Sequence, residues 1–138
     1  MVNIIDMQDM RYLNLFRKIT GVSTRFCLKY NEKIIFFVPR NLIPMALGEN
    51  GRNIREMSEI LGKKIKVIPG PKGIGDVKIF IRSIVDPVKF KDLEIKGNEI
   101  ILNAGSQSKA ALIGRNKRRL LEMQKITSDF FGKEFRIV

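Results

Sequence analysis

The sequence contains an internal repeat, and this repeat limits the possible folds more than any other feature. The segment LGENGRNIREMSEI (47–60) aligns without a gap with IGRNKRRLLEMQKI (113–126). Upstream, KYNEKIIFF resembles IKGNEIILN. Downstream, LGKKIKVI resembles FGKEFRIV, with four more residues, about one helical turn, in the second copy. Because the segments follow the same order in both halves, we expect one structural unit to occur twice.

Each copy is expected to have the element order αββααβ. In the first copy, the pattern predicts a helix capped by Asn3 or Asp6, strands at 24–30 and 33–39, a short helix at 42–47, a long helix at 51–61 and a strand at 63–69. In the second copy, it predicts helices at 76–84 and 106–113, a long helix carrying Leu120 and Phe130, and strands at 88–96, 99–103 and 134–138.

The segment GPKGIGD (70–76) separates the two copies. Its glycines suggest a phosphate-binding loop as one interpretation. The segment lacks the GxxxxGK[ST] spacing and the strand-to-helix context of such a loop, so a linker is the better interpretation. We therefore expect two domains, at residues 1–70 and 71–138, joined by a linker at about 69–76.

The chain is strongly basic along its whole length. It has 26 Lys and Arg against 14 Asp and Glu, which gives a formal net charge of +12 over 138 residues. Residues 1–70 hold 12 basic and 6 acidic side chains and residues 71–138 hold 14 and 8, so each half carries +6. This excess favours a polyanionic partner, either nucleic acid or an anionic membrane surface. The alternative is that the charge only keeps the protein soluble.

The residue types that are missing argue against an enzyme. The chain has no histidine, which removes histidine-based triads, general bases and metal ligands. No carboxylates lie at a spacing typical of catalysis, so we expect no catalytic residue, no metal and no cofactor. The one cysteine, Cys27, fits a buried hydrophobic position and a reducing cytoplasm. No apolar stretch is long enough to span a membrane.

The glycine turn inside the repeat is the candidate binding site. Two helices that meet at Gly-x-x-Gly leave backbone amides free at the start of the second helix, and these amides suit a phosphate. Without a Cβ atom, a sugar-phosphate chain can approach closely. The alternative is an ordinary helix–turn–helix corner with no ligand. The expected RNA-binding residues are Gly48, Glu49, Asn50, Gly51, Arg52 and Arg55 in the first copy, and Gly114, Arg115, Asn116, Lys117, Arg118 and Arg119 in the second.

The order helix, strand, strand, helix, GXXG, helix, strand resembles the prokaryotic type II form of the KH fold, whose GXXG loop clamps about four nucleotides. Nearly the whole chain resembles the archaeal NusA-like family, on the segments LNLFRKITG, RFCLKYNEKIIFFV, ALGENGRNIREMSEILGKKIKVI and ALIGRNKRRLLEMQK. The resemblance implies an α+β fold of two tandem type II KH domains, each with a three-stranded sheet covered by helices on one face.

The resemblance also implies a function. It indicates a non-enzymatic, cytoplasmic protein that binds single-stranded RNA and regulates transcription elongation or termination, and we expect a monomer. RNA polymerase is a second candidate partner. Bacterial relatives are longer and carry a polymerase-binding domain and an OB-type domain, neither of which fits in 138 residues.

Two residues depart from the family pattern. Glu49 stands in the first loop where a basic residue is usual, and its carboxylate would repel a phosphate. Lys117 replaces the second glycine of the second loop, where a left-handed backbone would cost about 1–2 kcal/mol. The cations around Lys117 oppose the helix dipole, which suggests a bound anion. The alternative interpretation is a protein-interaction module, associated with polymerase or ribosome, whose KH loops are degenerate.

Overall fold

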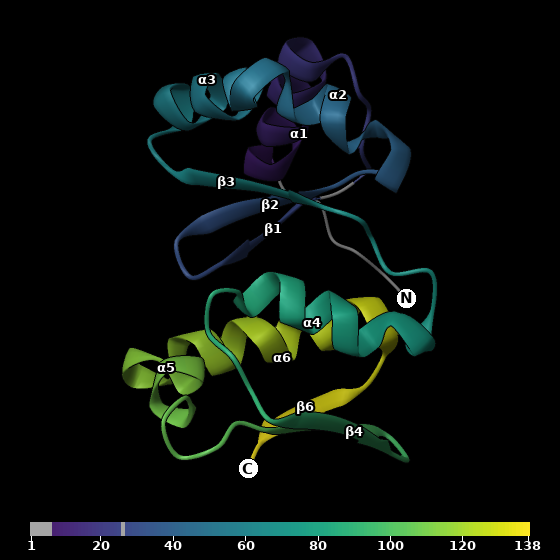
Figure 1. Cartoon of the computed structure of the whole chain (residues 1–138), viewed down its shortest axis with the longest axis vertical. Coiled ribbons are helices and arrows are strands. Elements are labelled where there is room, and N and C mark those ends of the chain that lie inside the picture. The colour runs from purple at the N-terminus through teal and green to yellow at the C-terminus, as the bar shows by residue number, and fades with distance from the viewer. Residues whose placement is uncertain (1–6, 26) are drawn as a thin grey trace. The chain divides into compact units, whose positions relative to one another are not determined.

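The computed structural model describes residues 7–25 and 27–138, and it has an α+β architecture with two three-stranded sheets (Figure 1). The chain divides into two compact units on either side of the Gly70–Pro71 bond, which we describe separately. The expected N-terminal caps, Asn3 and Asp6, lie outside the described residues.

The first unit has the element order expected from the sequence. Its elements are α1 (Met7–Thr20), β1 (Cys27–Tyr30), β2 (Lys33–Phe37), α2 (Ile43–Leu47), α3 (Arg52–Leu61) and β3 (Lys64–Ile68). The sheet order is β1-β2-β3, with β1 antiparallel and β3 parallel to the central strand β2. The three helices lie on one face of this sheet (Figure 1).

The central strand explains why the first unit folds in this way. Residues 34–38, IIFFV, are all buried, and Ile34, Phe36 and Val38 belong to the core that also contains Phe16 of α1. Phe36 stacks on Phe16 of α1 with ring centroids 4.4 Å apart, and both side chains have no exposed surface. Cys27 is half-buried against the same core. Because its ring is buried, Phe36 cannot stack on a base.

The second unit repeats this arrangement. Its elements are α4 (Val77–Val85), β4 (Asp92–Lys96), β5 (Glu99–Asn103), α5 (Lys109–Ile113), α6 (Arg118–Phe131) and β6 (Glu134–Ile137). The sheet order is β4-β5-β6, with the same antiparallel and parallel pairings, and its helices again lie on one face (Figure 1). Phe80 and Phe130 pack in the core, with ring centroids 5.2 Å apart.

The length of helix α6 agrees with the expectation from the sequence, whereas the length of strand β4 differs from it. Helix α6 has 14 residues and α3 has 10, as the four extra residues in the sequence predicted. The expected strand at 88–96 was too long, because β4 begins only at Asp92. The amide of Val88 donates to the carbonyl of Val85 in a turn, and pairing toward β5 starts with the bond from Lys91 to Asn103.

Candidate nucleic-acid interface

The first corner, which we define as residues 48–51 between α2 and α3, has an unusual backbone. Gly48 has φ 76° and ψ 173°, Asn50 has φ 54° and ψ 30°, and Gly51 has φ 73° and ψ 21°. The amide of Gly51 donates to the carbonyl of Gly48 at 3.2 Å and closes the turn. Three of the four residues therefore have positive φ angles, which glycine and asparagine tolerate better than other residues do.

The second corner, residues 114–117 between α5 and α6, has nearly the same backbone. Gly114 has φ 78° and ψ 170°, Asn116 has φ 56° and ψ 29°, and Lys117 has φ 60° and ψ 22°. The amide of Lys117 donates to the carbonyl of Gly114 at 3.2 Å, as in the first corner. Lys117 therefore adopts the left-handed conformation that is costly for a residue other than glycine, and the corner keeps its backbone geometry after the replacement.

The two glycine positions of each corner have different surroundings. A Cβ atom added at Gly48 would lie 2.8 Å from Cγ of Asn53, and one added at Gly114 would lie 2.9 Å from Cγ of Arg119. At Gly51 the nearest atom to an added Cβ would be Arg55 Nη1 at 3.9 Å, so there is room. Packing therefore requires the first glycine, whereas the second position is open toward solvent and can hold Lys117.

A side chain of the long helix holds each corner by a hydrogen bond to the preceding short helix. Asn53 Nδ2 donates to the carbonyl of Met45 at 3.2 Å, and Arg119 Nη1 donates to the carbonyl of Ala111 at 2.8 Å. These residues occupy matching positions of the repeat. The bonds satisfy carbonyls in the last turn of a helix, which have no partner within the helix. Asn53 was not among the residues expected from the sequence, although the repeat aligns it with Arg119.

Arg55 makes a contact that has no counterpart in the second corner. Its Nη1 donates to the carbonyl of Asn50 and ties α3 back to the loop. The repeat places Leu121 at the matching position of α6, where the side chain is 59% exposed. Among the expected RNA-binding residues, Arg55 and Arg119 thus have structural contacts of their own.

The remaining polar residues of the corners face solvent. In the first corner, Glu49 and Asn50 are exposed, and Arg52 is exposed at the start of α3. In the second corner, the exposed residues are Arg115, Asn116, Lys117 and Arg118. Neither long helix has a side-chain hydrogen bond at its N-cap residue, Gly51 or Lys117, within the described chain. The amides of Gly51 and Arg52, and of Lys117 and Arg118, donate to carbonyls of their own turns. Each corner therefore offers an anion from solvent the positive end of the dipole of its long helix.

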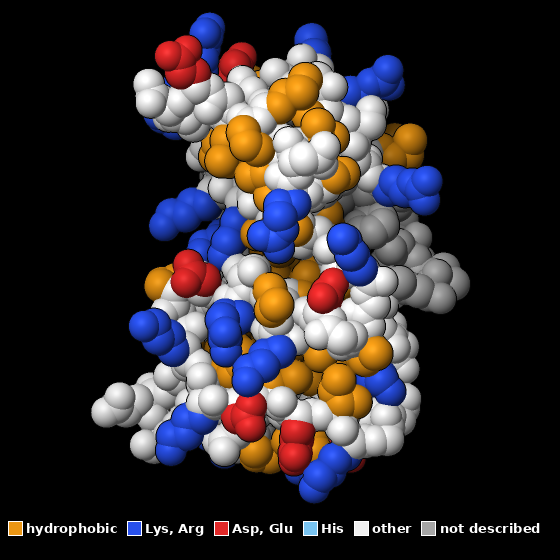
Figure 2. Space-filling view, turned by 45° about the vertical axis from the view of Figure 1, so that its right-hand side comes forward, with side chains coloured by type: hydrophobic (Ala, Val, Ile, Leu, Met, Phe, Trp, Pro, Cys, Tyr) orange, Lys and Arg blue, Asp and Glu red, His pale blue; other side chains and the backbone are white. Residues whose placement is uncertain are grey.

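Basic side chains are not confined to the corners. Figure 2 shows one face of the molecule, on which Lys and Arg side chains are spread over both units with Asp and Glu side chains between them. This distribution agrees with the equal net charge of the two halves of the sequence. The charge alone therefore does not select a site, and the corners stand out by their backbone geometry.

Other classes of site find little support in the described residues. In residues 7–25 and 27–138, no three His, Cys, Asp or Glu side chains cluster so as to hold a metal ion. In the same ranges, none of the helices has the length and apolar character needed to cross a bilayer. Phe36, Phe37 and Phe130 are buried, so their rings are not available to stack on bases.

The fold and the corners define an α+β protein with two αββααβ units, each with a solvent-facing corner between two helices. The chain is similar to proteins named probable transcription termination protein NusA from three archaea. It is 31% identical to that of Methanococcus vannielii over 71% of this chain, 25% identical to that of Methanocaldococcus jannaschii over 86%, and 23% identical to that of Halococcus morrhuae over 83%. The resemblance to the archaeal NusA-like family is thus confirmed.

The matches differ in how much of each relative they cover. The aligned part spans 56% of the Methanococcus vannielii protein, 66% of the Methanocaldococcus jannaschii protein and 87% of the Halococcus morrhuae protein. Among solved structures, the chain is similar to the crystal structure of APE1850, with a TM-score of 0.68 and 26% identity over 97% of this chain and 99% of the other. No protein-family model matches the chain.

Proposed function

We propose that this protein binds single-stranded RNA and regulates transcription elongation or termination. In this proposal, residues 1–70 and 71–138 are two tandem type II KH domains, with a linker at about 69–76, and neither is an enzyme. The protein acts as a monomer in the archaeal cytoplasm, with RNA polymerase as a second partner. The names of the archaeal relatives support the role in transcription, and the corners support the binding of RNA.

One observation carries the proposal. Both corners have the same backbone with positive φ angles, in the same place between two helices, although only two of their four residues are identical. In each corner the exposed loop leads directly into a long helix without a side-chain cap among the described residues. A helix start of this kind attracts a phosphate through its dipole, and the KH module uses a loop at this place to hold a nucleotide backbone.

The two corners would hold a phosphate with different groups. At the first corner, Gly51 has no side chain, so the sugar-phosphate chain can approach the backbone closely. At the second corner, the side chains of Arg115, Lys117 and Arg118 surround the same backbone and add charge-assisted contacts. Bases next to the bound phosphates would then contact the protein on either side of the corner.

The test is binding of a fluorescent single-stranded RNA at several salt concentrations. We expect affinity to fall steeply with salt, because each phosphate contact releases counterions. The variant R115E/K117E/R118E should lose most of the affinity. The matched control is K89E/K91E/K96E, which changes the net charge equally at exposed lysines of the same unit. Equal binding by both variants would show that total charge, and not the second corner, binds the RNA.

The second candidate function is a protein-interaction module, and the exposed carboxylate of Glu49 favours it. A carboxylate in the first corner repels phosphate, and it can accept hydrogen bonds from a protein partner. The discriminating experiment is a pull-down from nuclease-treated lysate. Capture of polymerase or ribosomal subunits without RNA, by a protein that binds no free RNA, would favour this candidate over the proposed function.

A further inference from the structure

Helix α1 of the first unit has a continuous exposed face (Figure 1). Its core side consists of Tyr12, Phe16 and Thr20, which are buried. The opposite side is a line of exposed side chains at helical spacing, about 16 Å long, which we call the α1 stripe. Its members are Met7, Met10, Arg11, Asn14, Arg17 and Lys18. The other exposed side chain of the helix, Gln8, lies off this line and accepts a hydrogen bond from Lys29 Nζ at 2.7 Å.

The α1 stripe carries three cations and no carboxylate, so its net charge is +3. The acidic residue of the helix, Asp9, is half-buried and accepts a hydrogen bond from Cys27 Sγ at 3.9 Å. Among residues 7–25 and 27–138, no ion pair, side-chain hydrogen bond or ring contact engages the three cations. Arg17 and Lys18 lie in the last turn, where cations stabilise the helix dipole. Arg11 lies in the middle of the helix, so the dipole does not account for it.

Helix α4, which is the first helix of the second unit, differs from α1 in this respect. It has two cations, and each one has a partner. Lys78 Nζ lies 3.1 Å from Asp92 Oδ1, and Arg82 lies over the ring of Phe90 with its Cζ 5.7 Å from the centroid. The α1 stripe is therefore a feature of the first unit alone and does not follow from the repeat.

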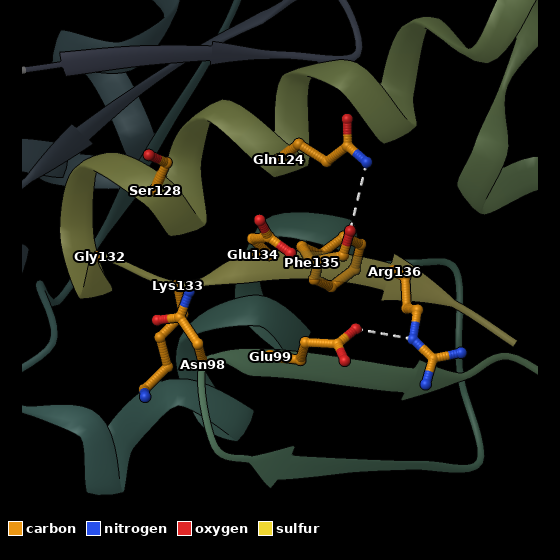
Figure 3. A pocket seen from close by; sticks show the side chains of 9 residues that line it. All are labelled: Asn98, Glu99, Gln124, Ser128, Gly132, Lys133, Glu134, Phe135 and Arg136. Atoms are coloured by element: carbon orange, nitrogen blue, oxygen red, sulfur yellow. Dashed lines mark hydrogen bonds and ion pairs between the residues drawn. The ribbon is translucent and has the colours of Figure 1, made fainter.

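Cations in the open pocket beside β6 of the second unit are also engaged (Figure 3). Arg136 Nε lies 2.8 Å from Glu99 Oε2, and Figure 3 shows the two side chains pointing toward each other. Lys133 Nζ donates to the carbonyl of Gly97 at 2.8 Å. The stripe on α1 differs from this pocket because its cations can still accept an anionic partner.

The composition of the α1 stripe suits a protein partner better than RNA. Met7 is 76% exposed and Met10 is 54% exposed, and methionine and arginine are enriched at protein interfaces. Surfaces that bind single-stranded RNA combine cations with aromatic side chains on which bases stack. The aromatic residues of α1, Tyr12 and Phe16, are buried instead. A second copy of this chain is also disfavoured, because its stripe would bring like charges together.

We infer that the α1 stripe docks an acidic amphipathic helix of a protein partner. The partner would place apolar side chains against Met7 and Met10, and carboxylates against the three cations. Arginine is well suited to this role, because its guanidinium binds a carboxylate through two parallel hydrogen bonds. The length of the stripe corresponds to about three helical turns, and its spacing is that of a face that packs on another helix. The inference goes beyond the proposed function, since it requires neither corner and no RNA.

The experiment titrates the ¹⁵N-labelled full chain with a synthetic helical peptide of about three turns. The peptide carries leucines to face the methionines and glutamates to face the cations. We expect chemical-shift changes concentrated on α1 and an affinity that falls as salt is added. A peptide with glutamine in place of glutamate should bind roughly tenfold more weakly, and one with alanine in place of leucine should also bind more weakly. Absence of shift changes on α1 at millimolar glutamate peptide would overturn the inference.

Variants of the stripe test the same contacts from the side of the protein. R11E/K18E should weaken peptide binding roughly tenfold, because two attractive pairs become repulsive. The matched control is R40E/K64E, which reverses the same number of charges at exposed residues of the same unit outside α1. It should bind the peptide nearly as the wild type does. M10A changes no charge and favours the helix, and it should weaken binding a few-fold. Wild-type affinity in both R11E/K18E and M10A would contradict the inference.

Single-stranded RNA serves as the rival ligand for the same proteins. We expect R11E/K18E to lower RNA affinity no more than R40E/K64E, because both change the net charge equally. A larger loss in R11E/K18E, with RNA-induced shift changes on α1, would assign the stripe to nucleic acid and overturn the inference. If the wild type binds RNA at the corners but no peptide, the inference fails alone. If it binds the peptide on α1 but no RNA, the inference holds and the proposed function fails.

Discussion

The first corner contains two glycines and a glutamate, whereas the second contains one glycine and two cations, yet their backbones agree closely. In both, the first glycine fits against a side chain of the long helix, and that side chain bonds back to the short helix. The second glycine is not needed for this geometry, since Lys117 adopts the same conformation. The two corners therefore share their backbone geometry and the contacts that support it. They differ in the side chains that they expose to solvent.

The largest effect should come from the first glycine, and it should be the same in both corners. We expect Gly48→Ala and Gly114→Ala each to lower the free energy of unfolding by about 2 kcal/mol or more. A positive φ angle costs an L-residue about 1–2 kcal/mol, and the new Cβ would also press on Asn53 or Arg119. Urea denaturation followed by circular dichroism measures the change.

The control for this prediction is Gly73→Ala. Gly73 has an extended backbone, and no atom lies within 4 Å of an added Cβ. We expect its effect to be close to zero. If Gly114→Ala were as stable as the control while Gly48→Ala were not, the first glycine would not be packed in the same way in the two corners.

A smaller loss should follow from removing the bonds between the helices. Asn53→Ala and Arg119→Ala each leave a carbonyl of the preceding helix without its partner, at a cost of about 1 kcal/mol. Arg119→Ala should also weaken RNA binding, because the corner loses both support and charge. Arg115→Ala removes the same charge from an exposed side chain and serves as the control. Equal stability of the two arginine variants would contradict a supporting role for Arg119.

Exchange of the second position tests the difference between the corners directly. Lys117→Gly should raise the free energy of unfolding by about 0.5 kcal/mol, because the strain that is relieved exceeds the added freedom of glycine in the unfolded chain. Gly51→Lys should lower it by a similar amount. Gly51→Lys should also weaken RNA binding despite the added charge, because its side chain blocks close approach to the backbone. Tighter binding by this variant would mean that charge governs the first corner as well.

The smallest effect should come from Glu49. Glu49→Lys should raise RNA affinity a few-fold at low salt, and the gain should fade as salt screens the exposed side chain. If the new lysine reaches a phosphate, the slope of log K against log salt should steepen by up to about one. No change at any salt concentration would indicate that this side chain points away from the RNA strand.

The order of helices and strands could be predicted because local signals mark each element, and the repeat shows the same order in both copies. Apolar residues at helical spacing, buried strand residues such as Ile34 and Ile35, and glycines after the helices all describe short segments of the chain. Strand β4 starts later than expected because a turn follows α4. Val88 and Phe90 in this turn region are residue types typical of strands, so the sequence favoured a strand there. The binding roles of the corner residues stay a prediction.

Contacts between elements were harder to predict. The bond from Asn53 to Met45 joins residues of two helices, and its geometry exists only once the corner has formed. The left-handed conformation of Lys117 follows from the surrounding helices, because lysine alone disfavours it. The signal in the sequence for these two features is the repeat, which aligns Asn53 with Arg119 and Lys117 with Gly51.

The matched backbones have a consequence for engineering this chain. Since residues 48–51 and 114–117 follow the same path within their own units, the tetrapeptides GENG and GRNK can be transplanted from one unit into the other without redesigning either scaffold. A set of four chimeras, with every combination of the two tetrapeptides, would treat each corner as an interchangeable cassette. Such a set would separate the effect of a loop's own side chains on RNA binding from the effect of the unit that carries the loop.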